Sequence, residues 1–359
     1  MNTGKETELT QAARQVVANS KRGVLATLQP ETGFPYASLV ELLPLPNGEV
    51  VLLLSRLAEH QQYAAVDDRV SLLLAPEMES PNALARPRVT LLGHLLPPLP
   101  ASEAAQANLA QAQTNFATDP TLDNTIWLGR RLAYVGQLAE AIQVYSDGLK
   151  RFPQAHQLYR HRGHRYISTR QFALAVADFE RAAVLATGQP VEVEPDGIPN
   201  RLNQPTSNGH FNIWYHLGLA YYLTGQLERA AAAYKVCMTY SDNPDSVCAT
   251  SDWLYMTLRE LGRHDEAAVL LEPIHEGMEL VESQSYHRRL LMYKGVLSPS
   301  DLLDSEGADD IEVATQGYGV GNYYRYNGEP EKANATFQRV LQTSNWSAFG
   351  YIAAEVALR

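Results

Sequence analysis

Residues 211–244 decide the fold, and they read FNIWYHLGLAYYLTGQLERAAAAYKVCMTYSDNP. The stretch places Gly218 and Ala230 among large apolar side chains, with Gly225 between them and the aromatic Tyr234 after them. Small residues let two helices approach closely, and aromatic side chains fill the space between neighbouring helix pairs. One such pair cannot bury its apolar face alone, so the stretch predicts a pair that stacks on similar neighbours.

The same arrangement returns along the chain with a phase of about 34 residues. The recurring residues, unit by unit, are Leu128-Gly129, Gly136, Ala141, Tyr145 and Pro153; Gly163, Tyr166, Ala175, Phe179 and Ala182; Trp214, Leu217-Gly218, Tyr221, Gly225, Ala230 and Tyr234; Gly262 and Ala267; and Gly321, Tyr324, Gly328, Ala333 and Phe337. This pattern resembles that of the tetratricopeptide-repeat (TPR) family over residues 122–345. The resemblance implies an all-α superhelix that binds peptides or proteins.

The expected solenoid covers residues 119–359, with units near 122–155, 156–189, 211–244, 248–281 and 314–347 and a capping helix at 346–358. Two insertions interrupt it. Gly188–His210 is rich in Pro, Asn and Gly, and Glu276–Ile311 combines a predicted helix at Ser285–Tyr293 with an acidic loop.

In tetratricopeptide proteins the first helix of each pair lines a concave groove. When the family's ligand positions are carried over by phase, they fall on a set of cationic, polar and aromatic residues. The partner-binding candidates among them are Arg130, Tyr134, Arg160, His164, Asn212, Tyr215 and Tyr222. Asn212 resembles the asparagine that fixes peptide backbone in carboxylate-clamp members, although the lysines of that clamp are absent.

The segment Leu158–Ser168, LYRHRGHRYIS, concentrates cations on one helix of a net-acidic solenoid. One hypothesis is a pocket for a carboxylate or an acidic peptide, because the planar guanidinium group binds carboxylates with two hydrogen bonds. The alternative hypothesis is that these side chains pair internally with Asp178, Glu192 and Glu194. The sequence leaves both open.

Before residue 118 the pattern differs, because short β-rich runs alternate with turn signals. Strands are expected at Gly23–Leu28, Tyr36–Leu43, Glu49–Leu54, Arg69–Ala75 and Val89–Leu96, and helices at Leu57–Ala65 and Ala101–Ala117. The sequence thus predicts an α+β protein with two domains: a partial antiparallel split β-barrel at 9–97, a helical connector at 98–118, and the all-α superhelix.

The barrel assignment rests on five motifs: GVLAT at 23–27, GFPYASLV at 33–40, LLSRLAEH at 53–60, DDRVSL at 67–72 and RVTLLG at 88–93. In order and spacing they resemble the FMN-binding split barrel of the pyridoxamine 5′-phosphate oxidase-like superfamily, particularly its haem-utilisation (HugZ-type) branch. The resemblance implies FMN as cofactor, with Ser55, Arg56 and His60 near the phosphate and Ser38 facing the ring. The family has further strands after the Gly93 strand, where this chain continues into a helix, so the barrel is expected to be partial.

The remaining features restrict the function. The net charge is −11, with −3 over residues 1–118 and −8 over residues 119–359, which disfavours a nucleic-acid partner. Cys237 and Cys248 are expected to be small buried side chains, and no histidine spacing indicates a metal site. The N-terminal residues lack the apolar region of a signal peptide, and no apolar run is long enough to span a membrane, so a cytoplasmic location is expected.

Two hypotheses follow. The first is a protein–protein interaction scaffold whose groove binds a peptide or protein, possessing a split-barrel remnant for homodimerisation. The second is a flavin-dependent oxidoreductase or haem-utilisation-type protein with a recruiting solenoid. Purified protein that is yellow would support the second hypothesis, whereas colourless protein that leaves added FMN unbound would exclude it.

Overall fold

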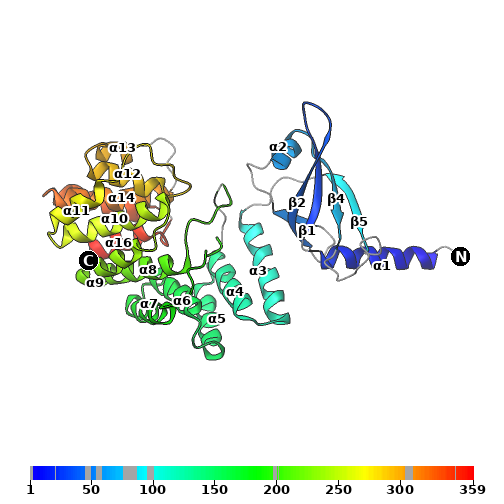
Figure 1. Cartoon of the computed structure of the whole chain (residues 1–359), viewed down its shortest axis with the longest axis horizontal. Helices are drawn as coiled ribbons and strands as arrows, with labels where there is room; N and C mark the ends of the chain where they lie inside the picture. The colour runs from blue at the N-terminus through cyan, green and yellow to red at the C-terminus, as the bar shows by residue number, and fades with distance from the viewer. Residues whose placement is uncertain are drawn as a thin grey trace. The chain divides into compact units, whose positions relative to one another are not determined.

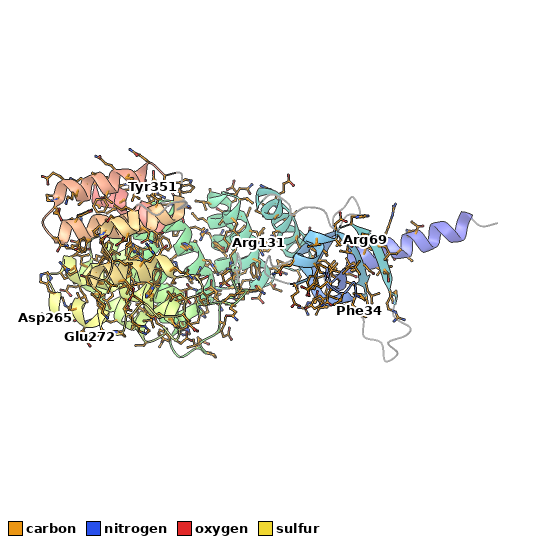
Figure 2. All side chains as sticks on the ribbon, turned by 90° about the horizontal axis from the view of Figure 1, so that it is seen from above. Phe34, Arg69, Arg131, Asp265, Glu272 and Tyr351 are labelled. Atoms are coloured by element: carbon orange, nitrogen blue, oxygen red, sulfur yellow. The ribbon has the colours of Figure 1, made fainter. Side chains whose placement is uncertain are left out.

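The computed structural model describes residues 3–20, 22–44, 50–53, 59–75, 87–94, 101–196, 200, 202–303, 310–343 and 345–359. The chain divides into two compact units, the first comprising Met1–Ala104 and Arg201–Asn203 and the second comprising Ala105–Asn200 and Gln204–Arg359. In Figure 1 the first unit is drawn in blue to cyan and the second in cyan through green and yellow to red. In Figure 2, Phe34 and Arg69 mark the first unit, and Arg131, Asp265, Glu272 and Tyr351 mark the second.

The first unit is an antiparallel sheet with two helices, and its strand order is β3-β2-β1-β4-β5. Its elements are α1 (Thr3–Asn19), β1 (Arg22–Leu28), β2 (Pro35–Pro44), β3 (Val50–Leu53), α2 (Glu59–Val66), β4 (Arg69–Leu74) and β5 (Val89–His94). Each strand lies at one of the expected β-rich runs. Helix α1 was not expected, because its only clear apolar signal lies near its end, where Val16 packs against the sheet.

The two faces of this sheet differ. On the covered face, Leu25, Leu72 and Leu74 are buried together with Val16 of α1. On the other face, cross-strand neighbours form an apolar row, because Val24 pairs with Leu39 of β2 and with Leu73 of β4. Leu92 of β5 lies on the same face, opposite Ser71 of β4. We call Val24, Leu39, Leu73 and Leu92 the open apolar row; Leu39 is 68% exposed and Leu92 80% exposed.

The second unit is helical. Its elements are α3 (Ala101–Thr118), α4 (Leu122–Tyr134), α5 (Leu138–Arg151), α6 (His156–Ser168), α7 (Phe172–Ala186), α8 (Gly209–Leu223), α9 (Leu227–Met238), α10 (Pro244–Glu260), α11 (His264–Leu271), α12 (Gln284–Tyr293), α13 (Pro299–Leu303), α14 (Asp310–Tyr326), α15 (Pro330–Leu341) and α16 (Phe349–Ala357). A helix pair lies at each of the five expected unit ranges, although α10 and α14 each begin four residues before the expected starts at 248 and 314. The expected connector is α3, whose Leu109 and Ala112 are buried in one core with Leu128 and Leu132 of α4.

Four of these pairs share one packing device, a glycine on the first helix against an aromatic ring on the second. Gly129 faces Tyr145, Gly163 faces Phe179, Gly218 faces Tyr234 and Gly321 faces Phe337. A Cβ atom at Gly218 would lie 2.6 Å from Tyr234 Cε1, so only glycine allows this approach of the two backbones. The recurring residues of the sequence are therefore contact partners.

The turn between the two helices of a pair uses the left-handed backbone region. Gly136, Gly225, Gly262 and Gly328 occupy it with φ between 70° and 83°. In the second pair the equivalent residue is Arg170, with φ of 61°. Its side chain donates from Nε to Glu355 Oε2 at 2.8 Å and from Nη2 to the Trp346 carbonyl at 2.7 Å. Arg170 thus fastens the C-terminal helix α16 to the second repeat.

The fourth pair departs from the device, because Tyr255 occupies the position that is glycine elsewhere. Tyr255 stacks on Tyr293 of α12 with a ring separation of 4.3 Å, so the second insertion supplies the partner. Helix α12 packs against α10 and α14, and α16 packs against α14 and α15 (Figure 1). The insertion after residue 276 is therefore part of the helical core.

Candidate functional site

The cations of α6 separate into distinct environments. Arg162 faces α7, where its Nε and Nη2 atoms each donate to a carboxylate oxygen of Asp178 at 2.8 Å. Burial raises the pKa of Asp178, and the guanidinium group opposes that rise. For this pair the hypothesis of internal pairing is confirmed.

Arg160 points toward the first insertion. Its Nη2 atom lies 2.9 Å from Glu194 Oε1, and the side-chain amide of Asn212 in α8 donates to Glu194 Oε2 at 3.1 Å. Arg130 of α4 donates from Nη2 to the backbone carbonyl of Pro195 at 2.9 Å. Three of the predicted partner-binding residues therefore come together, and they contact a segment of the chain itself.

We call Gln189–Asp196 the acidic segment, after its Glu192, Glu194 and Asp196. It is extended, and backbone hydrogen bonds hold it to Ser207 and to Gly209, the first residue of α8. The Glu194 N–H donates to the Ser207 carbonyl at 3.1 Å, and the Gly209 N–H donates to the Glu192 carbonyl at 3.0 Å. A cavity of about 320 Å³ lies between this segment, α4 and α6.

Charged groups of both signs meet at this contact, where Arg130 and Arg160 face the carboxylates of the acidic segment. Arg130, Arg160 and Arg165 all influence one another, and within the described chain Glu194 is the one carboxylate that pairs with any of them. Burial lowers the pKa of Arg160 and of Arg165, while Glu194 opposes this for Arg160. The guanidinium groups stay charged, because an arginine pKa lies far above neutral pH.

His164 is partly buried at the end of α6. Arg165 Nη2 lies 2.5 Å from His164 Nδ1, and because a guanidinium can only donate, Nδ1 accepts and the proton is on Nε2. Burial, followed by the neighbouring Arg165, holds the pKa of His164 well below its usual value, so the ring is neutral. Its ring packs on His216, with a centroid separation of 4.7 Å, and on Phe349, at 5.4 Å.

The three predicted partner-binding tyrosines lie in two different environments. Tyr134 is partly buried, and its hydroxyl accepts a hydrogen bond from Arg130 Nε at 3.4 Å. Tyr215 is buried and donates to the Tyr286 hydroxyl at 3.1 Å, and Tyr222 is buried and accepts from the Tyr318 hydroxyl at 2.9 Å. Helices α12 and α14 cover Tyr215 and Tyr222, so these two residues act here as packing residues.

Sequence reasoning missed other residues on the inner side of the helical unit. Arg165 fell outside the family's ligand positions, yet it lines the same cavity as Tyr134 and His164. Trp253, Tyr286 and Arg289 also line it, and the last two come from the second insertion, which has no counterpart in the repeat pattern. The sequence signal that could have found Arg165 was the cation density of α6.

For the implied FMN site, the structure locates one of four side chains. Ser38 lies on the covered face of the sheet, opposite Leu25 of β1. Ser55 and Arg56 are outside the described residues, and His60 lies in α2 with its side chain outside the description. The flavin pocket therefore stays a prediction.

Other absences concern only the described part of the chain. It contains no group of three His, Cys, Asp or Glu side chains that could hold a metal ion. None of its helices has the length and apolarity to cross a bilayer. Cys237 and Cys248 are buried and free, and burial raises the pKa of each thiol to about 12, so both are unreactive thiols at neutral pH.

Comparison with known proteins identifies the repeats. Residues 211–244 match the family model of the tetratricopeptide repeat. No curated protein matches the chain. A tetratricopeptide repeat protein from Parabacteroides merdae is similar, with 13% identity over 72% of this chain and 93% of that one and a TM-score of 0.42.

Two further solved structures are similar over different parts of the chain. YrrB, described as a TPR protein with an unusual peptide-binding site, has 16% identity over 68% of this chain and 97% of its own, with a TM-score of 0.37. A haem-binding protein from Mycobacterium smegmatis has 34% identity over 31% of this chain, with a TM-score of 0.26. This chain spans 46% of the length of that protein. The family match and the helix pairs around it support tetratricopeptide repeats in the second unit, and repeats of this kind suggest a protein-interaction scaffold.

Proposed function

We propose that the helical unit binds an acidic, extended segment of a partner protein at Arg130, Arg160 and Asn212. The observation that supports this most directly is that the chain's own acidic segment already lies on these three residues. The residues thus possess the chemistry to hold an extended acidic strand.

These contacts recognise two parts of the ligand, its main chain and an acidic side chain. Arg130 binds a main-chain carbonyl, which any extended peptide offers, whereas Arg160 and Asn212 together bind a carboxylate. An acidic residue followed by an exposed carbonyl is therefore the minimal ligand. Charge-assisted hydrogen bonds of this type are roughly twice as strong as neutral ones, so the carboxylate should dominate the affinity.

The acidic segment also competes with any partner for the same three residues. Because it is tethered, it competes at an effective concentration in the millimolar range for short linkers. A partner must displace it, and partial detachment would expose Arg160 and Arg130. Binding should therefore be weak in the parent protein and tighter when the internal carboxylate is removed.

The test uses the full chain and a fluorescein-labelled peptide of the sequence PVEVEPD, which corresponds to residues 190–196. Anisotropy should show tighter binding to the Glu194→Ala variant than to the parent protein. Adding Arg160→Ala to that variant should abolish the gain, while a peptide carrying Gln for each Glu should bind neither protein.

Melting temperatures separate a binding role from a structural one. Arg160→Ala should weaken peptide capture without lowering the melting temperature by more than the Glu194→Ala change does. Equal peptide binding by the parent protein and Glu194→Ala would count against the proposal, as would an Arg160→Ala variant that unfolds.

The first unit supplies a second proposal, self-association through the open apolar row. Val24, Leu39 and Leu73 lie side by side across three strands, and isolated apolar side chains do not usually align in this way. A second copy of the chain offers an identical row, and homodimers with two-fold symmetry are the commonest oligomers.

Sedimentation velocity of the full chain tests the dimer. The parent protein should show a concentration-dependent dimer, and Leu39→Lys combined with Leu73→Lys should be monomeric. Leu174→Lys is the matched control, because Leu174 is an exposed leucine on α7 of the helical unit. A parent protein that stays monomeric at every concentration contradicts this proposal.

A further inference from the structure

A cavity of about 540 Å³ lies in the helical unit. Its walls come from the end of α4, from α6, from Trp253 of α10, from α12 and α14, and from the C-terminal residues Trp346–Gly350. We call it the inner cavity. Its volume lies within the range of about 300–1,000 Å³ that is typical of small-molecule sites.

The C-terminal residues close one side of the inner cavity. Arg170 holds the Trp346 carbonyl and Glu355, and the Phe349 ring packs on His164 and His216. Gly350 lies so close to the Ala314 carbonyl that a Cβ atom would collide with it. The wall formed by residues 346–350 is therefore fixed by contacts to both α6 and α14.

The electrostatics of the inner cavity are one-sided. Among the described residues, two arginines line it and no carboxylate does. Arg289 is 1% exposed and forms an ion pair with Asp252, so its charge is balanced. Arg165 has no carboxylate within ion-pair distance in the described chain, and its contact with His164 brings no negative charge. A partly buried guanidinium without a counter-charge is costly, and an anion in the cavity would remove that cost.

Other residues of the lining carry hydrogen-bond donors. His164 carries its proton on Nε2, since Nδ1 accepts from Arg165. Within the described chain, the Trp253 indole N–H and Arg165 Nε are buried donors without an acceptor. Buried donors of native proteins normally find acceptors, so two residues of this wall carry donors whose hydrogen bonds are not made within the described chain.

The apolar part of the lining is aromatic. Tyr134, Trp253, Tyr286, Trp346 and Phe349 all contribute to it. Flat rings suit a flat apolar ligand, because aromatic pairs gain about 0.5–1.5 kcal/mol beyond the area they bury. A cavity of this composition would accept an apolar body at one side while its donors hold a charged group.

We propose that the inner cavity binds a small organic anion, a carboxylate or phosphate on a flat apolar body, with Arg165 as its main charge partner. Arg165 contacts neither the acidic segment nor Glu194 in the described structure. The proposal is consequently independent of the peptide site, and either can fail while the other holds.

Calorimetric titration of the full chain with three probes tests the ligand class. Benzoate and phenyl phosphate carry the two anionic groups, and benzyl alcohol is a neutral ligand of similar shape. Saturable binding of benzoate or phenyl phosphate, with none of benzyl alcohol, is expected. The anion that binds more tightly shows whether the charged group of the ligand is a carboxylate or a phosphate. Equal binding of all three probes, or of none, would overturn the proposal.

Arg165→Met should weaken the binding of the preferred anion by about ten- to a hundredfold, the factor expected for a lost charge-assisted hydrogen bond. Arg162→Met is the matched control on the same helix, because Arg162 is paired with Asp178 and does not line the cavity. Phe349→Ala tests the aromatic wall and should weaken both anions together.

Melting temperatures without added anion distinguish a ligand site from a structural one. Arg165→Met should melt at or above the temperature of the parent protein, because it removes an unbalanced charge. Arg162→Met should melt lower, because it leaves Asp178 buried without a partner. If Arg165→Met lowers the melting temperature as much as Arg162→Met, Arg165 is structural and the proposal fails.

Discussion

The glycine-to-ring packing of the repeats can be tested at Gly218, inside the repeat that the family model matches. Replacing Gly218 with Ala places a Cβ atom 2.6 Å from Tyr234 Cε1 and 2.7 Å from Cζ. Favourable carbon–carbon contacts are about 3.5–4.0 Å, so the ring must retreat by about 1 Å. Tyr234 is 0% exposed, so the retreat displaces other buried side chains.

The magnitude follows from two opposing effects. Overpacking of a core typically costs about 1–3 kcal/mol, and alanine in a helix interior is about 1 kcal/mol better than glycine. The contact at Gly218 is severe, so we expect Gly218→Ala to lower the free energy of unfolding by about 1–2 kcal/mol. Gly209→Ala, at the open start of the same helix, should be neutral or stabilising, because nothing lies within 4 Å of its added Cβ.

Urea unfolding followed by circular dichroism measures both changes, and a double-mutant cycle with Tyr234→Leu identifies the cause. Leucine lacks the ring atoms that meet the new Cβ, so Gly218→Ala should become neutral or stabilising in the Tyr234→Leu background. If Gly218→Ala costs the same in both backgrounds, or no more than Gly209→Ala, the ring is not what requires glycine.

Two further predictions concern Arg170 and the buried histidines of the helical unit. Arg170→Gly should relieve about 1 kcal/mol of left-handed backbone strain but remove the ion pair with Glu355. Amide hydrogen exchange in α16 should therefore accelerate. Unchanged exchange would show that Arg170 does not hold this helix in place. The free energy of unfolding should also fall as the pH drops below about 6.5. Burial lowers the pKa of His161, His164 and His216 in the folded state, that of His216 to about 3. The same imidazoles take up protons in the unfolded state, which the acid therefore stabilises. Urea midpoints at pH 7.5, 6.5 and 5.5 measure this, and His216→Phe should flatten the dependence by about one proton; a variant with the slope of the parent protein would contradict the assignment.

The sequence by itself determined the helix pairs of the repeats and the strands of the first unit. Both follow from local spacing. Gly218 and Tyr234 lie on consecutive helices joined by a short turn, so the residue types specify a contact that the chain cannot avoid. Likewise, β-rich runs separated by turn residues such as Gly33 specify antiparallel neighbours.

Only the tertiary structure decided what the cations of α6 do. Arg160, Arg162 and Arg165 are close in sequence, but a helix turns by about 100° per residue, so each meets a different environment. One pairs with Asp178 and one with Glu194, whereas Arg165 lines a cavity without a counter-charge in the described chain. The acidic segment and the C-terminal wall of that cavity have no repeat period, so their positions depend on contacts between residues far apart in the chain, which spacing alone does not encode.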